Sequence, residues 1–222
     1  DLQKEGDCFR LETDRTTIRS RIAVGAYGRR EKLDRKLSRP FIKATYPYVA
    51  FKTHIRNVDT ENRVELFALD RGYCGMSRVE DGLTNICWIT HIDALKSIGG
   101  TPQEYWKTIL QQNISLQDYI RRVEPEHEFA SSSQLFFHEK EAVIDDILMI
   151  GDAAGMIAPL AGDGMAMAID SAINVSELAV RYLSGAISRS LMNSEYGAQR
   201  RRRYRTRMAM ARTLHKALSN TT

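Results

Sequence analysis

The clearest hydrophobic pattern in the chain is a short apolar run that passes through glycines into a helix. Residues 147–150 are all apolar and predict a short buried strand. Gly151 follows at once, so the backbone can turn there without a Cβ against a bound ligand. From about Met165 the sequence is rich in Ala and Met and free of Gly and Pro until Gly185, which predicts a helix. This order is typical of the ligand-binding edge of an α/β domain.

Alternating apolar and polar residues in the middle of the chain predict an antiparallel sheet with one polar face. The clearest run covers residues 49–56, where Val, Phe, Thr and Ile alternate with Ala, Lys, His and Arg. Further strands are expected at 64–69, 73–77 and 84–90, with turns at 70–72 and 80–82. Thr101-Pro-Gln-Glu104 predicts a helix start that turns Tyr105, Trp106, Ile109 and Leu110 inward.

The two ends of the chain carry their own patterns. Residues 1–17 predict a hairpin that turns at residues 14–15, and residues 22–24 predict a strand that ends in Gly25-Ala-Tyr-Gly28 before a basic helical stretch. Residues 199–218 predict a basic helix. One face of that helix is expected to carry Tyr204, Met208, Ala211, either Leu214 or His215, and Leu218.

The chemistry of the 147–165 stretch suits a flavin. Asp152 stands at the carboxyl end of the predicted strand, where a carboxylate can accept hydrogen bonds from ligand hydroxyls such as those of a ribityl chain. Gly162 and Gly164 allow main-chain amides to approach a flat ring, and Asp163 is the expected N-cap of the helix. A helix start carries roughly half a positive charge, which favours the negative charge of a reduced flavin.

These residues also match a family. Gly151-Asp-Ala-Ala-Gly155, Pro159 and Gly162-Asp-Gly-Met165 resemble the second FAD-binding motif of flavoproteins with the para-hydroxybenzoate hydroxylase-like fold. Within this family the geranylgeranyl reductase and FixC-type dehydrogenase branch is the most similar. The resemblance implies that Asp152 holds the ribityl chain and that the loop backbone lies against the isoalloxazine ring. The implied cofactor-binding residues are Gly151, Asp152, Ala153, Pro159, Leu160, Gly162, Asp163, Gly164 and Met165. Ala166 stands where aromatic hydroxylases often carry Asn, which favours the reductase branch.

A second segment resembles the family with two departures. Gly25-Ala-Tyr-Gly28 is similar to a Gly-Ala-Asp-Gly segment, but Tyr27 takes the place of the aspartate and Glu31 that of a following serine. The sequence contains no Gly-x-Gly-x-x-Gly fingerprint of an amino-terminal βαβ unit. We therefore expect a truncated flavoprotein, the carboxyl-terminal part of a longer protein without the unit that grips the ADP half of FAD. These residues alone are expected to bind FAD poorly and to be inactive.

Residues 72–86 resemble the substrate-domain hairpin of the family. Tyr73, Cys74, Met76 and Trp88 are candidates to line a substrate cavity, and the alternative is that they are core residues of the sheet. The implied substrate is small and hydrophobic, with isoprenoids among the candidates. The five histidines are dispersed and none is assigned as catalytic, and the three cysteines form no metal-ligand cluster with them.

Charge and composition limit the location and the partners. The chain has no run of about 18 apolar residues, so no transmembrane helix is expected. Cysteines without a C-x-x-C pair favour reduced thiols in a cytoplasmic protein. From Arg181 onward ten Lys or Arg residues face one acidic residue, although the whole chain has a net charge of only +4. That excess indicates either a solvated face of a packing helix, arginines that pair with acidic patches elsewhere, or peripheral contact with the inner face of an anionic membrane. No nucleic acid is expected.

The predicted fold class is α+β, with an α/β FAD domain remnant around an antiparallel substrate-domain sheet. Residues 1–40 and 141–185 are assigned to the FAD-binding domain, 41–140 to the substrate domain and 186–222 to the basic helix. The expected function is an FAD-dependent oxidoreductase, a reductase or dehydrogenase of a hydrophobic substrate with NAD(P)H as a candidate electron donor. The alternatives are an FAD-dependent monooxygenase or halogenase-like enzyme, and a non-catalytic module that binds a membrane surface through the basic helix.

Overall fold

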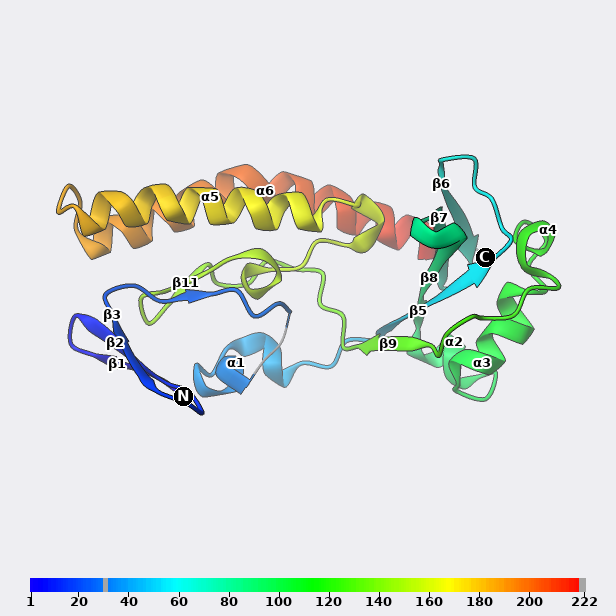
Figure 1. Ribbon diagram of the computed structural model, residues 1–222, viewed down its shortest axis with the longest axis horizontal. Coiled ribbons are helices and arrows are strands. Elements are labelled where there is room, and N and C mark those ends of the chain that lie inside the picture. The colour runs from blue at the N-terminus through cyan, green and yellow to red at the C-terminus, as the bar shows by residue number, and fades with distance from the viewer. Residues whose placement is uncertain (30–31, 220–222) are drawn as a thin grey trace. The chain divides into compact units, whose positions relative to one another are not determined.

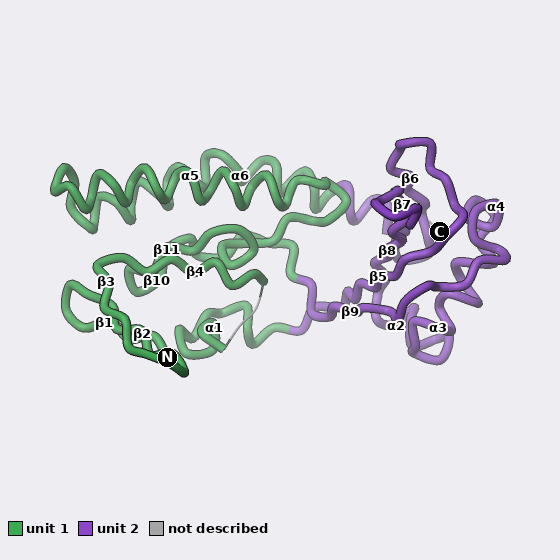
Figure 2. The backbone as a smooth tube through the Cα atoms, viewed as in Figure 1, with its two compact units in different colours: residues 1–44, 136–213 green, residues 45–135, 214–222 purple. Residues whose placement is uncertain are grey.

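The chain folds into two compact units. A computed structural model describes residues 1–29 and 32–219. Unit 1 combines Asp1–Ala44 with Phe136–Thr213, and unit 2 combines Thr45–Leu135 with Leu214–Thr222 (Figure 2). Unit 1 holds a small mixed sheet with helices and unit 2 a larger antiparallel sheet, so the α+β class predicted from the sequence is confirmed.

The centre of unit 1 is a three-stranded sheet in the order β10-β11-β4. Strand β11 (Ile147–Met149) pairs in parallel with β4 (Val24–Gly25) and antiparallel with β10 (Val143–Ile144). The apolar run is buried because its side chains enter two different cores. Leu148 packs with Val175, Leu178, Met192 and Tyr196, whereas Ile147 and Met149 pack with Phe9. The predicted strand at 147–150 is confirmed for its first three residues.

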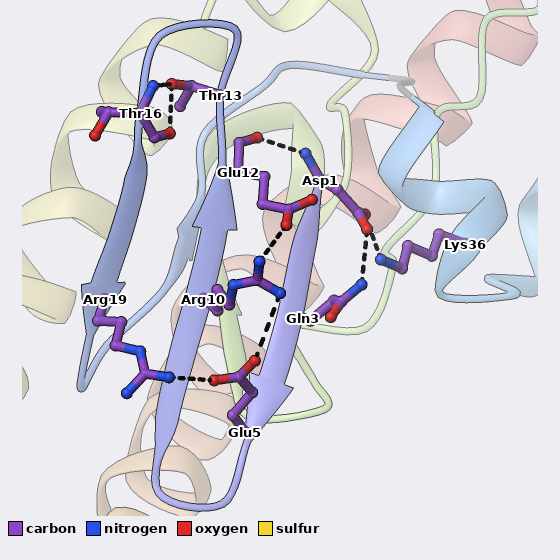
Figure 3. Close-up of polar contacts among 9 residues, drawn as sticks. All are labelled: Asp1, Gln3, Glu5, Arg10, Glu12, Thr13, Thr16, Arg19 and Lys36. Carbon is purple, nitrogen blue, oxygen red and sulfur yellow. Dashed lines mark hydrogen bonds and ion pairs between the residues drawn. The ribbon is translucent and has the colours of Figure 1, made fainter.

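Unit 1 also contains a second sheet, a three-stranded antiparallel meander. It consists of β1 (Leu2–Glu5), β2 (Cys8–Glu12) and β3 (Thr17–Ser20), so the predicted hairpin has one more strand than expected. Glu5 of β1 accepts from Arg19 of β3 at 3.2 Å, and Asp1 pairs with Lys36 of helix α1 (Lys32–Lys36) (Figure 3). Exposed pairs of this kind contribute about 0–1 kcal/mol each, so the buried Phe9 does more to hold the meander in place.

Two long helices complete unit 1 and lie side by side in Figure 1. They are α5 (Gly164–Leu183) and α6 (Arg189–Ser219), and the residues of α6 from Leu214 onward belong to unit 2. Arginines join them through ion pairs of Arg203 with Asp170 at 2.5 Å and of Arg181 with Glu195 at 2.8 Å. Helix α6 lies within the 186–222 range assigned to the basic helix, and it begins ten residues before the basic run at 199–218 because Met192 and Tyr196 are buried against Leu148. Of the two residues left open on its inner face, His215 is buried and Leu214 is exposed.

Unit 2 is built on a five-stranded antiparallel sheet in the order β6-β7-β8-β5-β9. Its strands are β5 (Tyr48–Arg56), β6 (Val64–Leu69), β7 (Gly72–Arg78), β8 (Leu83–His91) and β9 (Ala130–Ser133). The four strands predicted from alternation are confirmed to within one residue at each end. Strand β9 was not predicted because Ala-Ser-Ser-Ser carries no hydrophobic alternation, and it forms by pairing with β5.

Short helices cover one face of this sheet. They are α2 (Ile92–Lys96), α3 (Pro102–Tyr105), the π-turn η3 (Trp106–Leu110) that continues α3, and α4 (Gln117–Ile120). The 3-10 turns η1 (Pro40–Lys43) and η2 (Glu80–Gly82) serve as connectors. The Glu104 amide donates to Thr101 Oγ1 at 3.2 Å, which confirms Thr101 as the N-cap. Trp88, Tyr105 and Trp106 form the aromatic centre of the core.

Within residues 1–29 and 32–219, no helix combines the length and the apolar character needed to cross a membrane. The cysteines are free thiols, and burial raises the pKa of Cys74 and Cys87.

Removing the aromatic centre of unit 2 should destabilise it strongly. Trp88 is fully buried, so Trp88→Ala should lower the free energy of unfolding by about 3–5 kcal/mol. Val64 lies on β6 of the same sheet and is 70% exposed, so Val64→Ala should change it by less than about 0.5 kcal/mol. Urea denaturation followed by circular dichroism measures the free energy of unfolding of both variants. Equal losses in the two variants would contradict the placement of Trp88 at the centre of the core.

His215 should make the stability of unit 2 fall in acid. Its ring lies 4.6 Å from that of Tyr48 and 5.9 Å from that of Tyr73, and burial lowers its pKa from 6.5 to about 4. The unfolded chain therefore binds the proton first, so stability from this group is present above pH 6.5 and is lost as the pH falls toward 4.

The slope should be as much as about 1.4 kcal/mol per pH unit in that window. Urea titrations between pH 4.5 and 7 should show a shallower slope for His215→Gln than for the natural protein. If His215→Gln shows the same slope as the natural protein, the proposed role of His215 in the pH dependence of stability is wrong.

Candidate functional site

The turn that follows β11 is the centre of the candidate site. It is the 3-10 turn η4 (Gly151–Ala154), at the carboxyl end of the parallel pair β4 and β11. Gly151 has a φ of +54°, and a Cβ there would come within 3.2 Å of the Cβ of Ala168 on α5. The Gly151 amide also donates to Ser171 Oγ at 3.2 Å. Glycine is required here because the turn and the helix approach so closely.

An open cleft of about 400 Å³ lies beside this turn, within unit 1. Two glycine-containing loops and the start of α5 line it, through Ala26 and Gly28, Gly151 and Asp152, and Gly164 and Met165. Its volume falls in the roughly 300–1,000 Å³ range of small-molecule and cofactor pockets. The sheet edge, the carboxylate and the helix start that were predicted together from the sequence do meet at one cleft.

The other residues assigned from the sequence lie elsewhere. Ala153 is fully buried behind the turn. Pro159, Leu160 and Gly162 belong to or follow the 3-10 turn η5 (Pro159–Ala161), which leads to α5 and does not line this cleft. Their contact with an isoalloxazine ring stays a prediction.

Asp163 occupies the N-cap position of α5, but its side chain makes no capping bond. Its carboxylate instead accepts from Arg207 of α6 at 2.7 Å. The predicted capping role of this side chain is therefore wrong, because an ion pair with a neighbouring helix has taken the carboxylate. The amides at the start of α5 are left without a side-chain cap beside the cleft.

Three basic side chains hold the turn by its backbone carbonyls, an arrangement that we call the carbonyl clamp. Lys140 Nζ donates to the carbonyl of Asp152 at 2.9 Å. Arg39 Nη1 donates to that of Ala153 at 2.8 Å, and Arg200 Nη2 to that of Ala154 at 2.9 Å. The cations come from three separate parts of unit 1: the segment before β10, the segment before η1, and α6. The turn is therefore held through its carbonyls, while Gly151 and Asp152 border the cleft.

Arg39 is the deepest member of the carbonyl clamp. It is fully buried together with Asp34, whose Oδ1 accepts from Arg39 Nη1 at 3.0 Å. Tyr27 joins this pair, since its hydroxyl donates to Asp34 at 2.6 Å and accepts from Arg39 at 3.1 Å. Burial, chiefly, raises the pKa of Tyr27 to about 12, so the phenol stays protonated and serves as a donor. The tyrosine that departs from the family pattern thus completes a buried ion pair, whereas Glu31, the other departure, lies outside the described residues.

Lys140 ties the two loops of the cleft together. Its ammonium donates to the carbonyl of Arg29 at 2.5 Å as well as to that of Asp152, and it lies 4.2 Å from the centre of the Phe41 ring. Burial lowers the pKa of Lys140 from 10.5 to about 8. Lys140 could not be predicted as a site residue, because a single lysine in an irregular segment carries no pattern.

Asp152 is half-buried at the wall of the cleft. Burial raises the pKa of its carboxyl group, and the positive charges of Lys140, Arg29 and Arg200 act against that rise. These three charges thus favour the ionised form of Asp152, the form with the greatest capacity to accept hydrogen bonds. The arrangement can bind a ligand that presents hydroxyl groups to the carboxylate and a flat or negatively charged group to the start of α5.

The candidate substrate residues are placed in unit 2. Cys74, Met76 and Trp88 belong to the core cluster between the sheet and its helices, and Tyr73 is buried beside His215. Their packing agrees with the alternative that they are core residues, and a place in a substrate cavity stays a prediction.

Comparison with solved structures shows the fold. The chain is similar to the flavin-dependent halogenase CmlS (TM-score 0.75, 18% identity), with 92% of this chain and 39% of that one covered. It is similar to a mutant of PqsL from P. aeruginosa (TM-score 0.74, 18% identity, 99% and 62% covered). A third similar structure is the flavin-dependent brominase Bmp2 (TM-score 0.72, 16% identity, 88% and 52% covered). The chain thus spans less than two thirds of the length of these structures, and no curated protein matches it.

The match to a protein family covers nearly the whole chain. The sequence model of a family described as the FAD binding domain matches residues 5–211, a range that includes β4, the turn, α5 and most of α6. This match shows that the chain belongs to the family described as the FAD binding domain.

Proposed function

We propose that this chain is the flavin-holding part of an FAD-dependent oxidoreductase, and that the cleft beside η4 receives the flavin end of FAD. The single observation that carries the proposal is the meeting of Asp152, the glycines of two loops and the uncapped start of α5 at one cleft. The ends of parallel strands and the starts of helices are common places for nucleotide cofactors.

The residues present fit the chemistry of FAD. The carboxylate of Asp152 can accept hydrogen bonds from ribityl hydroxyls, and the amides at Gly164 and Met165 can face an electron-rich ring edge. FAD supplies the redox chemistry when it is bound, and the protein supplies position and electrostatics. The carbonyl clamp contributes to both, because it fixes the turn and places positive charge against its carbonyls.

For the reaction itself we propose the reduction or dehydrogenation of a small hydrophobic substrate, with isoprenoids among the candidates and NAD(P)H as the candidate electron donor. The support is the Gly-Asp-Gly-Met run at 162–165 and Ala166, which resemble the geranylgeranyl reductase branch.

A second candidate is an FAD-dependent monooxygenase or halogenase. The observation that favours it is the set of structural neighbours, since CmlS is a flavin-dependent halogenase and Bmp2 a flavin-dependent brominase. Both candidates use the same flavin site and differ in whether oxygen takes part.

Membrane-surface contact through α6 stays a separate proposal, with or without catalysis. Arg203, Arg207 and Arg181 are taken by ion pairs with acidic residues, which explains part of the positive charge. The exposed Arg201, Arg202 and Arg205 are the residues that an anionic bilayer would attract.

Asp152→Ala should weaken FAD binding by about 10- to 100-fold, the equivalent of one or two hydrogen bonds to a charged acceptor. The measurement is the FAD content after gel filtration and the Kd from quenching of flavin fluorescence, in the natural polypeptide that contains residues 1–222. The matched control is Glu177→Ala, which removes an exposed carboxylate from α5 and should leave the Kd unchanged. If Asp152→Ala retains its full FAD content, the assignment of the site is wrong.

Oxygen uptake should separate the two reaction classes. A reductase supplied with NAD(P)H and a hydrophobic alkene should consume both without oxygen, under anaerobic conditions. A monooxygenase or halogenase should take up oxygen in proportion to the product formed. An oxygen electrode together with mass spectrometry of the product measures this, and uptake coupled to product would overturn the reductase proposal.

A further inference from the structure

We propose that Lys140 is a positioning residue for the flavin, one that sets the separation of the two cleft loops and supports the charge of Asp152. This inference rests on the proposed function. It goes beyond the assignment of the site because Lys140 does not line the cleft and no sequence motif contains it.

Lys140 bonds to both sides of the cleft. Ala26 and Gly28 line one wall of the cleft, and Gly151 and Asp152 line the other. Lys140 Nζ donates to the carbonyl of Arg29, next to the first wall, and to the carbonyl of Asp152 in the second. One ammonium group therefore spans the two walls. The peptide of Lys140 is also anchored, since its amide donates to the carbonyl of Ala154 at 3.2 Å, so the side chain starts from a fixed point.

The backbone conformation of Gly155 allows the segment of Lys140 to lie against the turn. Gly155 forms a bridge with Glu139 and has a φ of +128°. A Cβ at Gly155 would lie 2.8 Å from the carbonyl oxygen of His138 and 3.1 Å from the amide of Lys140. The glycine thus allows the 138–140 backbone to lie directly on the turn, within reach of a lysine.

Four charged groups surround the ammonium group of Lys140. The charged groups that face Lys140 are Asp34 and Arg39 from the buried pair, Arg29 from the first loop and Asp152 from the turn. Burial is the main cause that lowers the pKa of Lys140, to about 8, and the two arginines lower it further while the two carboxylates raise it. The ribityl hydroxyls of FAD would donate to the ionised carboxylate of Asp152, the form that protonated Lys140 favours. Binding should therefore favour the protonated lysine, and by linkage protonation should favour binding.

This linkage distinguishes positioning by charge from a purely structural contact. The affinity of the natural protein for FAD should be constant below pH 7 and should fall by about three- to tenfold between pH 7 and pH 9, as Lys140 loses its proton. A guanidinium keeps its charge throughout this range. Lys140→Arg should therefore bind FAD at pH 9 about as well as at pH 7.

The experiment measures the Kd of FAD from fluorescence quenching between pH 6.5 and 9, in the natural polypeptide that contains residues 1–222. Lys140→Met should bind at least about tenfold more weakly at pH 7 and should show a flat pH profile. The matched control is Lys36→Met, because Lys36 also donates to a backbone carbonyl, that of Leu2 at 2.8 Å, but does not touch the walls of the cleft. Thermal denaturation of each variant shows whether it is folded.

The outcomes separate this inference from the proposed function. A flat profile of the natural protein, or a Lys140→Met variant with unchanged affinity beside an Asp152→Ala variant that has lost FAD, overturns the role of Lys140 alone. If Asp152→Ala and Lys140→Met both bind FAD as the natural protein does, the site itself is wrong. If Lys140→Met does not fold, the profile of the natural protein and its loss in Lys140→Arg still decide the question.

Discussion

The site depends on the capture of three successive backbone carbonyls by three cationic side chains. Lys140, Arg39 and Arg200 bond to the carbonyls of Asp152, Ala153 and Ala154. Carbonyl groups alone do not offset the cost of burying charge, which is several kcal/mol per ion. Asp34 accordingly pairs with Arg39, and the Tyr204 ring lies 5.1 Å from the Arg200 guanidinium. The free-energy cost of burying these cations is explained if ligand binding requires the turn to keep one conformation.

The rest of unit 1 brings these groups to the turn. Parallel pairing of β4 with β11 places the loop after Gly25 beside the turn, and the close approach at Gly151 sets the start of α5 against it. Helix α6 brings Arg200 to the carbonyl of Ala154, while its Arg203 pairs with Asp170 of α5 and its Arg207 with Asp163 just before α5. The basic character of α6 is therefore in part a structural property of the flavin domain.

Much of this architecture follows from local sequence. The apolar run 147–149, the glycine at 151 and the helix after residue 163 each have a pattern with a physical cause, as do the four alternating strands of unit 2. The carbonyl clamp could not be predicted, because Arg39, Lys140 and Arg200 are far apart in sequence and meet only in three dimensions. Strand β9 and the ion pair of Asp163 could not be predicted for the same reason. The strand forms by pairing with β5, and the ion pair forms with Arg207 of α6, and both partners are distant in the sequence.

An experimental structure with FAD bound tests the central claim most directly. The account predicts that a ribityl hydroxyl oxygen lies within about 3.2 Å of the Asp152 carboxylate, beside Gly151 and the start of α5. It also predicts that the three cations still bond to the carbonyls of Asp152, Ala153 and Ala154. A flavin found away from this cleft, or an Asp152 side chain turned from it with the carbonyls released, would contradict the account.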